Sequence, residues 1–158
     1  MKVGVGIADV MCGMYASSGI LTALRHRNMT GAGQHIDLAW VDAQIAWLIN
    51  EGTNYLTGGA LPERRGNGHP NTVPYQAFAV REGHVVIAVG NDGQFKRFAD
   101  WMGKPEWADN PSFTTNSAGL SHLNELVGLI SDALKGGKTD TAIKGLGGIG
   151  VPVGPVKT

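Results

Sequence analysis

The stretch Gly6-Ile7-Ala8-Asp9-Val10-Met11-Cys12-Gly13-Met14-Tyr15 decides the fold of the first third of the chain. After Asp9 the sequence carries no charge for 15 residues, from Val10 to Leu24. Apolar residues recur there at helical spacing between many small ones, which predicts a largely buried helix that runs to about Arg27. Aspartate is a favoured N-cap residue, so Asp9 is predicted to cap the start of this helix. The basic cluster Arg25-His26-Arg27 suits its C-terminus. A transmembrane span needs about 20 apolar residues, so we expect no span here.

The chemistry expected of Asp9 follows from this position. The unpaired N–H groups of a first helical turn stabilise negative charge. A carboxylate held there can act as a nucleophile if a substrate reaches it. On these residues alone, a plain helix cap without chemistry remains the commoner interpretation.

Further along the chain, turn residues separate segments with clear periodicity. The pattern predicts a short strand over 34–39 and a helix from Asp42 to about Leu56 that ends at Gly58-Gly59. Residues 61–73 are rich in proline and glycine and are predicted to form a linker over the surface.

The second half of the chain alternates between strand and helix patterns. Tyr75–Val80 and His84–Val89 predict a β-hairpin, and the continuously apolar run 85–89 predicts a strand buried on both faces. Apolar spacing predicts a helix capped by Asn91 or Asp92, a short helical turn over 105–111, a longer helix through Leu134 capped by Ser121, a weak helix from Thr139 and an edge strand over 151–156.

The segment between the buried strand and the next helix is a candidate binding loop. It consists of Gly90, Asn91, Asp92, Gly93 and Gln94. Such a loop offers free N–H groups and little bulk, so it can close over a small acyl group or an oxyanion. An ordinary strand–helix turn is the alternative, and the residues alone favour it.

The composition narrows the classes of function. Thirteen basic and 13 acidic residues give no net charge, which argues against nucleic acid and anionic membranes as partners. Cys12 is the only cysteine, so an internal disulfide is excluded. It is predicted to be a buried, inert thiol. We find no signal-peptide pattern and expect a cytoplasmic protein. The five histidines show no ligand spacing, so no metal is expected.

One motif matches a known pattern by letters alone. Gly145-Leu146-Gly147-Gly148-Ile149-Gly150 reads G-x-G-x-x-G. A dinucleotide site needs a strand before this motif and a helix after it, and neither is predicted here. We therefore reject it as a nucleotide site.

Several segments together resemble the family III CoA-transferases, also called the CaiB/BaiF family. The segments run in the family's order across nearly the whole chain: Ile7–Met14, Leu24–Arg27, Thr30–Ala39, Arg65-Gly66-Asn67, Pro74-Tyr75-Gln76, Val89–Phe95 and Gly150–Val156. The resemblance implies an acyl-CoA:carboxylate CoA-transferase in which Asp9 is the nucleophile and forms an aspartyl-CoA thioester. It places the loop 90–94 over the active site, with a weak leaning toward dicarboxylic acids. Asn91 and Asp92 stand where that loop is glycine-rich in the family, which puts the mobility of the loop in doubt.

The resemblance also implies an architecture. It predicts an α/β protein in which residues 1–60 form a helix–strand–helix part of a large nucleotide-type (Rossmann-like) domain. Residues 61–73 would be a linker and residues 74–158 a small α/β (α+β) domain. Coenzyme A would enter as an acyl-CoA substrate beside a small carboxylic acid, and two chains would form a homodimer. Family members have a long segment before Asp9, so the chain is expected to be a central fragment.

Two other functions stay open at this point. In the related 2-methylacyl-CoA racemases, the matching aspartate moves an α-proton together with a histidine upstream of it, and no histidine precedes Asp9 here. Alternatively, the chain is a catalytically inactive fragment that serves as a folding or dimerisation module.

Overall fold

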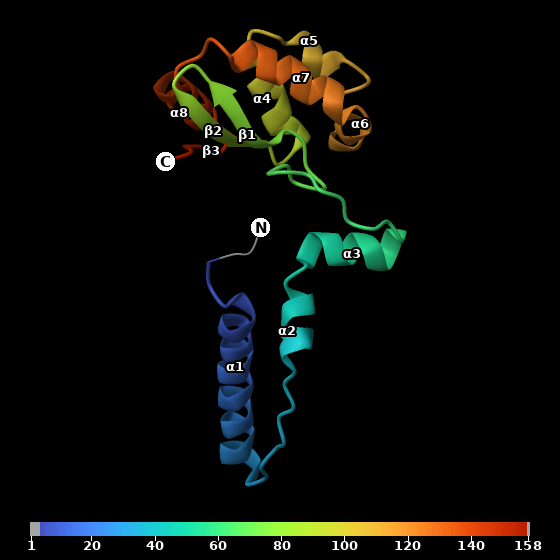
Figure 1. The fold of residues 1–158 in the computed structure, drawn as a ribbon, viewed down its shortest axis with the longest axis vertical. Coiled ribbons are helices and arrows are strands. Elements are labelled where there is room, and N and C mark those ends of the chain that lie inside the picture. The colour runs from blue at the N-terminus through green and yellow to red at the C-terminus, as the bar shows by residue number, and fades with distance from the viewer. Residues whose placement is uncertain (1–3, 158) are drawn as a thin grey trace. The chain divides into compact units, whose positions relative to one another are not determined.

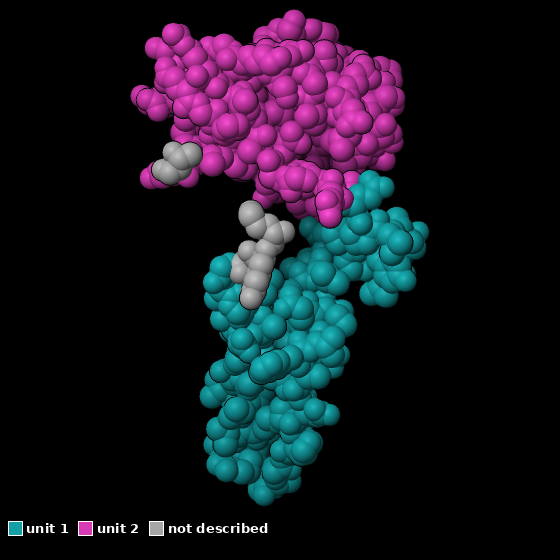
Figure 2. Space-filling view, in the orientation of Figure 1, with its two compact units in different colours: residues 1–63 teal, residues 64–158 magenta. Residues whose placement is uncertain are grey.

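The structure is a computed structural model and describes residues 4–157. Residues 1–63 and 64–158 form two compact units, coloured separately in Figure 2. This division falls within the predicted linker 61–73. The assignment of the flanking parts to a large and a small domain of a whole enzyme stays a prediction.

The regular secondary structure in the described residues of the first unit consists of three helices. Helix α1 (Ile7–Thr30) is followed by an extended segment over 31–39, by α2 (Trp40–Ala46) and by α3 (Ile49–Gly58) (Figure 1). The extended segment returns along α1, and Ile36 packs close to Gly19, where a Cβ would lie 3.5 Å from Ile36 Cγ2. The predicted strand over 34–39 is wrong: the segment has no strand partner among the described residues, so its alternation produces no ladder.

Two further predictions for this unit need correction. The single helix from Asp42 to Leu56 is divided into α2 and α3 because the chain turns at Trp47–Leu48, and Ile49 takes a φ of 38°. The Gly58-Gly59 stop is confirmed, since Gly59 adopts a left-handed φ of 71° and its N–H donates to the Tyr55 carbonyl.

The prediction that the first helix is largely buried is also wrong for this chain. Among the described residues of the first unit only Cys12 and Ala43 are buried. The helices leave many large apolar side chains exposed: Val10, Met14, Tyr15, Ile20, Leu21, Met29, Trp40, Val41, Ile45, Leu48, Ile49 and Leu56. Large apolar side chains that gather at a protein surface usually mark a site of interaction.

Helix α1 extends beyond the charge-free run of 15 residues at both ends. The helix has 24 residues, and by length and composition it is apolar enough to cross a membrane. Core helices of soluble proteins and signal sequences share this length and composition, so these two properties alone do not identify a membrane span.

The second unit is built on a three-stranded antiparallel sheet in the order β1 (Tyr75–Val80), β2 (Gly83–Ala88), β3 (Val153–Pro155). The register places Phe78 opposite Val85, so both side chains lie on the same, buried face. Five helices follow: α4 (Asp92–Trp101), α5 (Glu106–Asp109), α6 (Asn116–Ser121), α7 (Leu123–Leu134) and α8 (Thr139–Gly148) (Figure 1). Helices α7 and α8 contact the strands, α4 packs against α8, α5 packs against α4, and α6 packs against α7. The core is made by Val80, Ile87, Phe95, Phe98, Leu126, Ile130, Leu134 and Leu146.

The opposite face of this sheet is open. Val86 is 37% exposed between the fully buried Val85 and Ile87, so β2 alternates between a covered and a solvent-facing side. The prediction that residues 85–89 are buried on both faces is therefore wrong. An antiparallel sheet needs only one covered face, and an apolar run does not distinguish the two cases.

Both edges of the sheet are protected. Along β1, the Asn67 side chain accepts the Ala77 N–H at 2.7 Å, and the His69 N–H donates to the Tyr75 carbonyl at 2.9 Å. The His69 ring stacks on Tyr75 with centroids 4.9 Å apart. Residues 67–69 of the predicted linker are thus folded onto the second unit. On the other edge, β3 has only three residues, and its last residue is Pro155.

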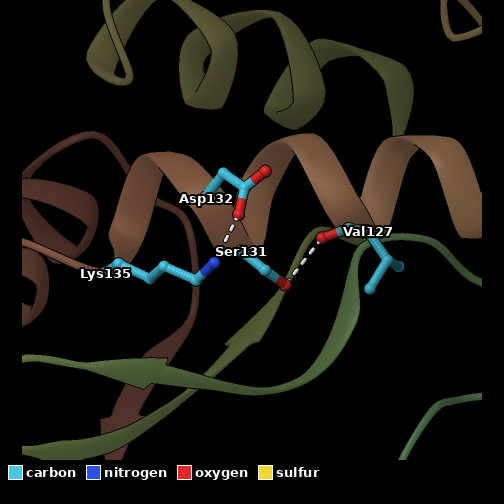
Figure 3. Close-up of polar contacts among 4 residues, drawn as sticks. All are labelled: Val127, Ser131, Asp132 and Lys135. Atoms are coloured by element: carbon cyan, nitrogen blue, oxygen red, sulfur yellow. Dashed lines mark hydrogen bonds and ion pairs between the residues drawn. The ribbon is translucent and has the colours of Figure 1, made fainter.

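Helix α7 presents a polar side as well as its core face (Figure 3). Ser131 Oγ donates to the Val127 carbonyl at 2.7 Å, and Lys135 Nζ lies 2.6 Å from Asp132 Oδ1. This ion pair is largely exposed, so it adds at most about 1 kcal/mol. The predicted cap at Ser121 is wrong: that residue ends α6, a helix that the pattern did not predict, and α7 begins after His122.

Candidate active site

Asp9 lies in the first turn of α1 but does not cap it. The helix begins at Ile7, its N-cap is Gly6, and no side chain accepts a hydrogen bond from the capped turn. Asp9 therefore occupies the third helical position, and the prediction that it is the N-cap is corrected. The carboxylate is exposed and stays in the region where the helix dipole favours negative charge.

The Asp9 carboxylate leans back over Gly6. A Cβ built on Gly6 would lie 2.8 Å from Asp9 Oδ2, which is too close for unbonded atoms. Only the absence of a side chain at position 6 permits this orientation of the carboxylate. The predicted inert thiol lies one turn further along the helix, where Cys12 is buried and free.

The candidate loop 90–94 begins α4 and is tied together by its own side chains. Asn91 is the N-cap, and its Oδ1 accepts the Gln94 N–H at 2.9 Å, which confirms one of the two predicted caps. Gln94 Oε1 in turn accepts the Gly90 N–H at 2.6 Å. Two N–H groups that the sequence suggested were free to bind a ligand are therefore already paired.

The same loop is also tied to segments far away in the sequence. Gln94 Nε2 donates to the Gly150 carbonyl at 3.1 Å. Arg97 Nε donates to the Ile149 carbonyl at 2.8 Å, while its Nη1 donates to the Gly93 carbonyl at 3.0 Å. These bonds join the loop to the turn between α8 and β3.

On its other side the loop contacts α6. Asp92 Oδ1 accepts the backbone N–H of Asn116 at 3.0 Å. The Asn116 side chain then accepts the Val73 N–H at 3.0 Å and donates to the Asn71 carbonyl at 2.8 Å. Asp92 thus takes part in the network that fixes the last residues of the predicted linker.

The structure divides the predicted site residues between the two units. Asp9 belongs to the first unit, and all five loop residues belong to the second. Their roles in catalysis and binding stay predictions. Sequence reasoning missed Gly6, Arg97 and Asn116. Of these three, only Arg97 could have been found from local sequence, because residues four positions apart are neighbours on a helix and Arg97 follows Gly93 by four.

The described residues hold no cluster of three or more potential metal ligands. The rejected G-x-G-x-x-G motif lies mainly inside α8. Gly145 packs against the Trp101 indole, and a Cβ there would lie 2.1 Å from Trp101 Nε1. This glycine therefore serves close packing within the second unit.

Comparison with known proteins identifies the family. The sequence profile of CoA-transferase family III matches residues 1–158. The chain is 42% identical over its whole length to the succinate–glutarate CoA-transferase of Agrobacterium fabrum, of which it covers 40%. It is 33% identical to the human succinyl-CoA:glutarate CoA-transferase and to the acetyl-CoA:oxalate CoA-transferase of Acetobacter aceti, of which it covers 36% and 39%.

Two solved structures are also similar to this chain. A crystal structure of a CAIB/BAIF family protein from Brucella suis matches the whole chain with a TM-score of 0.69 and 42% identity, and the chain covers 42% of it. A hypothetical protein from Mycobacterium tuberculosis shares the fold with a TM-score of 0.82 at 19% identity, and the chain covers 41% of it.

The chain belongs to CoA-transferase family III. It spans about 40% of the length of the curated relatives reported above. The predicted α/β class is confirmed as a mixture of helices and a small antiparallel sheet. A Rossmann-like arrangement is not seen, because the described residues of the first unit form no sheet.

Proposed function

We propose that the protein transfers coenzyme A from an acyl-CoA to a small carboxylic acid, with Asp9 as the nucleophile. The observation that carries this proposal is the Asp9 carboxylate, which is exposed in the first turn of a 24-residue helix. A dipole of that orientation stabilises the anion without covering its oxygens. Relatives that match the whole chain are named as CoA-transferases.

The proposed reaction proceeds in four balanced steps. An oxygen of Asp9 attacks the thioester carbonyl of the acyl-CoA, which gives a mixed anhydride and releases CoA thiolate. The thiolate attacks the Asp9 carbonyl carbon and expels the donor acid as a carboxylate, leaving an aspartyl-CoA thioester. The incoming carboxylate attacks this thioester, forms a second anhydride and releases the thiolate again. The thiolate finally attacks the acyl carbon of the acceptor, and the Asp9 carboxylate is restored.

We propose dicarboxylic acids as donor and acceptor. The relatives reported above are named for succinate, glutarate and oxalate, which are all short dicarboxylates. A racemase is not proposed, since no observation favours it: that chemistry needs a second base across the α-carbon.

The experiment that tests the function combines transfer with trapping. Succinyl-CoA and glutarate are incubated with the protein, and the expected result is glutaryl-CoA, detected by liquid chromatography. Hydroxylamine added with succinyl-CoA should convert the aspartyl-CoA thioester into a hydroxamate, which peptide mass spectrometry should locate at Asp9. Transfer without any hydroxamate at Asp9 would reject the proposed nucleophile. The absence of both products would support a catalytically inactive module instead.

We also propose that the chain self-associates through its first unit. The exposed apolar side chains of α1, α2 and α3 leave this unit without a core of its own, and burying them is worth about 25 cal/mol per Å². Light scattering coupled to size exclusion should give at least twice the monomer mass at micromolar concentration. A uniform monomer peak would contradict this.

A further inference from the structure

We propose that residues 33–39 form the centre of an interface between two copies of this chain, by pairing antiparallel with the same residues of the second copy. This inference rests on the self-association proposed above and assigns it a place in the first unit. The two-fold axis of the pairing passes beside Ile36. In the described part of a single chain the segment is extended and belongs to no sheet.

The backbone of this segment is available for pairing. On one side the last hydrogen bond is at Ala32, whose N–H donates to Thr30 Oγ1. On the other side the next is at Ala39, whose carbonyl accepts the Ala43 N–H. Between them, residues 33–38 make no hydrogen bond to any other described residue, and residues 33–37 are exposed. An extended run of unpaired N–H and C=O groups is a template for another strand.

The segment has two different faces, as a strand does. Ile36 packs on α1, where its Cγ2 lies 3.5 Å from the position of a Cβ on Gly19. Gln34 and Ile36 line the hollow beside α1, whereas His35 and Asp37 do not. Successive side chains of an extended chain point to opposite faces. His35 and Asp37 therefore lie on the face that points away from α1.

The order of the side chains selects one register of self-pairing. With the axis at Ile36, His35 of each copy lies opposite Asp37 of the other, and an imidazole can donate a hydrogen bond to a carboxylate. An axis at His35 sets two imidazoles opposite each other, and an axis at Asp37 sets two carboxylates opposite each other. Opposite charges directly across an antiparallel pair are stabilising, and like charges are destabilising. Of these three registers, the axis at Ile36 is the favourable one.

The same register brings the apolar helices of the two copies to one side. Residues directly opposite each other in an antiparallel pair point to the same face, so both copies of α1 lie on one face of the two-stranded ribbon. Ile20 and Leu21 of α1 are exposed apolar side chains that this arrangement can bury. A two-stranded ribbon alone is marginally stable in water, so this burial is expected to supply much of the affinity.

Disulfide trapping tests the register. The test uses a Cys12→Ala background, which removes the only native thiol. In this background Ile36→Cys places two cysteines directly opposite each other, with Cα atoms about 4.5–5.5 Å apart, which is within the range that a disulfide spans. Oxidation should therefore convert the dimer into a covalent dimer, seen on a non-reducing gel.

Gln34→Cys in the same background is the matched control. Gln34 is also exposed and lies on the same face as Ile36. In the proposed register it lies opposite Leu38, so the two introduced cysteines are about 14 Å apart and should form no disulfide. Crosslinking at both positions would indicate a parallel or unspecific encounter and would overturn the inference. Crosslinking at neither position would overturn it as well.

A charge swap tests the pairing of His35 with Asp37. His35→Asp sets carboxylates opposite each other at two places in the interface, so the dissociation constant of the dimer should rise about tenfold. The double variant His35→Asp with Asp37→His restores an opposite pair at each place and should return to within about twofold of the parent. Sedimentation equilibrium at neutral pH measures both constants. A double variant as weak as His35→Asp would contradict the proposed register.

Light scattering distinguishes this inference from the self-association on which it rests. A parent chain that stays monomeric would reject both. A parent dimer whose Ile36→Cys variant forms no disulfide would reject this interface and leave self-association through another surface of the first unit. None of these measurements uses acyl-CoA, so a failure of the proposed transferase activity does not affect their outcome.

Discussion

Asp9→Asn should lower the rate of CoA transfer at least about 10³-fold, because a carboxamide cannot form the anhydride or the aspartyl-CoA thioester on which the proposed reaction depends. The substitution keeps the size and hydrogen-bonding shape of the side chain. Succinyl-CoA and hydroxylamine should then give no hydroxamate at position 9. Transfer is measured by chromatography of the CoA esters.

Asp42→Asn is the matched control. Asp42 is also an exposed aspartate in the first turn of a helix of the first unit, α2. Its substitution removes the same charge from an equivalent backbone position, so it should retain transfer within about twofold of the parent. Far-UV circular dichroism should show the same helix content in both variants. Residual transfer by Asp9→Asn at the level of Asp42→Asn would exclude Asp9 as the nucleophile.

Gly145→Ala should destabilise the second unit by about 2–3 kcal/mol, although alanine is the better helix former by about 1 kcal/mol. The added Cβ would lie 2.1 Å from Trp101 Nε1 and 2.6 Å from Trp101 Cε2, so the indole ring has to leave its place against α8. Overpacking of this severity outweighs the gain in helix propensity. Urea unfolding followed by tryptophan fluorescence measures the difference.

Gly147→Ala, two residues further along the same helix, should have the opposite effect. A Cβ at this position meets no atom within 4 Å, so only the propensity gain remains and the unit should become about 0.5–1 kcal/mol more stable. The two variants change the same residue type in the same helix, and the expected effects differ in sign. Equal destabilisation by both would mean that packing against Trp101 is not what position 145 requires.

The sequence predicts the second unit better than the first because the second unit buries its own apolar residues. Phe95 and Phe98 mark the core face of α4, and β1 and β2 form the predicted hairpin, with Gly83 in β2. In the first unit the apolar residues of α1 do not gather on one face, and most of them are exposed. A sequence pattern predicts which side chains favour burial, but it does not identify the surface that covers them.

The failures within elements have local physical causes. Aspartate is favoured both at the N-cap and within the first turn of a helix. The residue type of Asp9 therefore could not show that the N-cap is Gly6. The division between α2 and α3 depends on the positive φ of Ile49, which is uncommon for a β-branched residue and has no sequence signal.

The candidate site was predictable only in part. The role of Asp9 comes from the family resemblance, since the residues around it equally describe an ordinary helix start. The cap at Asn91 follows from the residue type. The bonds from Gln94 and Arg97 to residues 149–150 join positions 56 and 52 residues apart, and no local pattern encodes such pairs.

The two outer strands of the small sheet have a consequence for how the protein behaves at high concentration. Asn67 and His69 occupy backbone groups of β1 that would otherwise recruit a foreign strand, and β3 is too short to act as a template. Cross-β stacking of folded molecules should therefore not begin at these two sheet edges. Precipitation should instead begin at the exposed apolar side chains of the helices in residues 4–63, and mild detergent should reduce it.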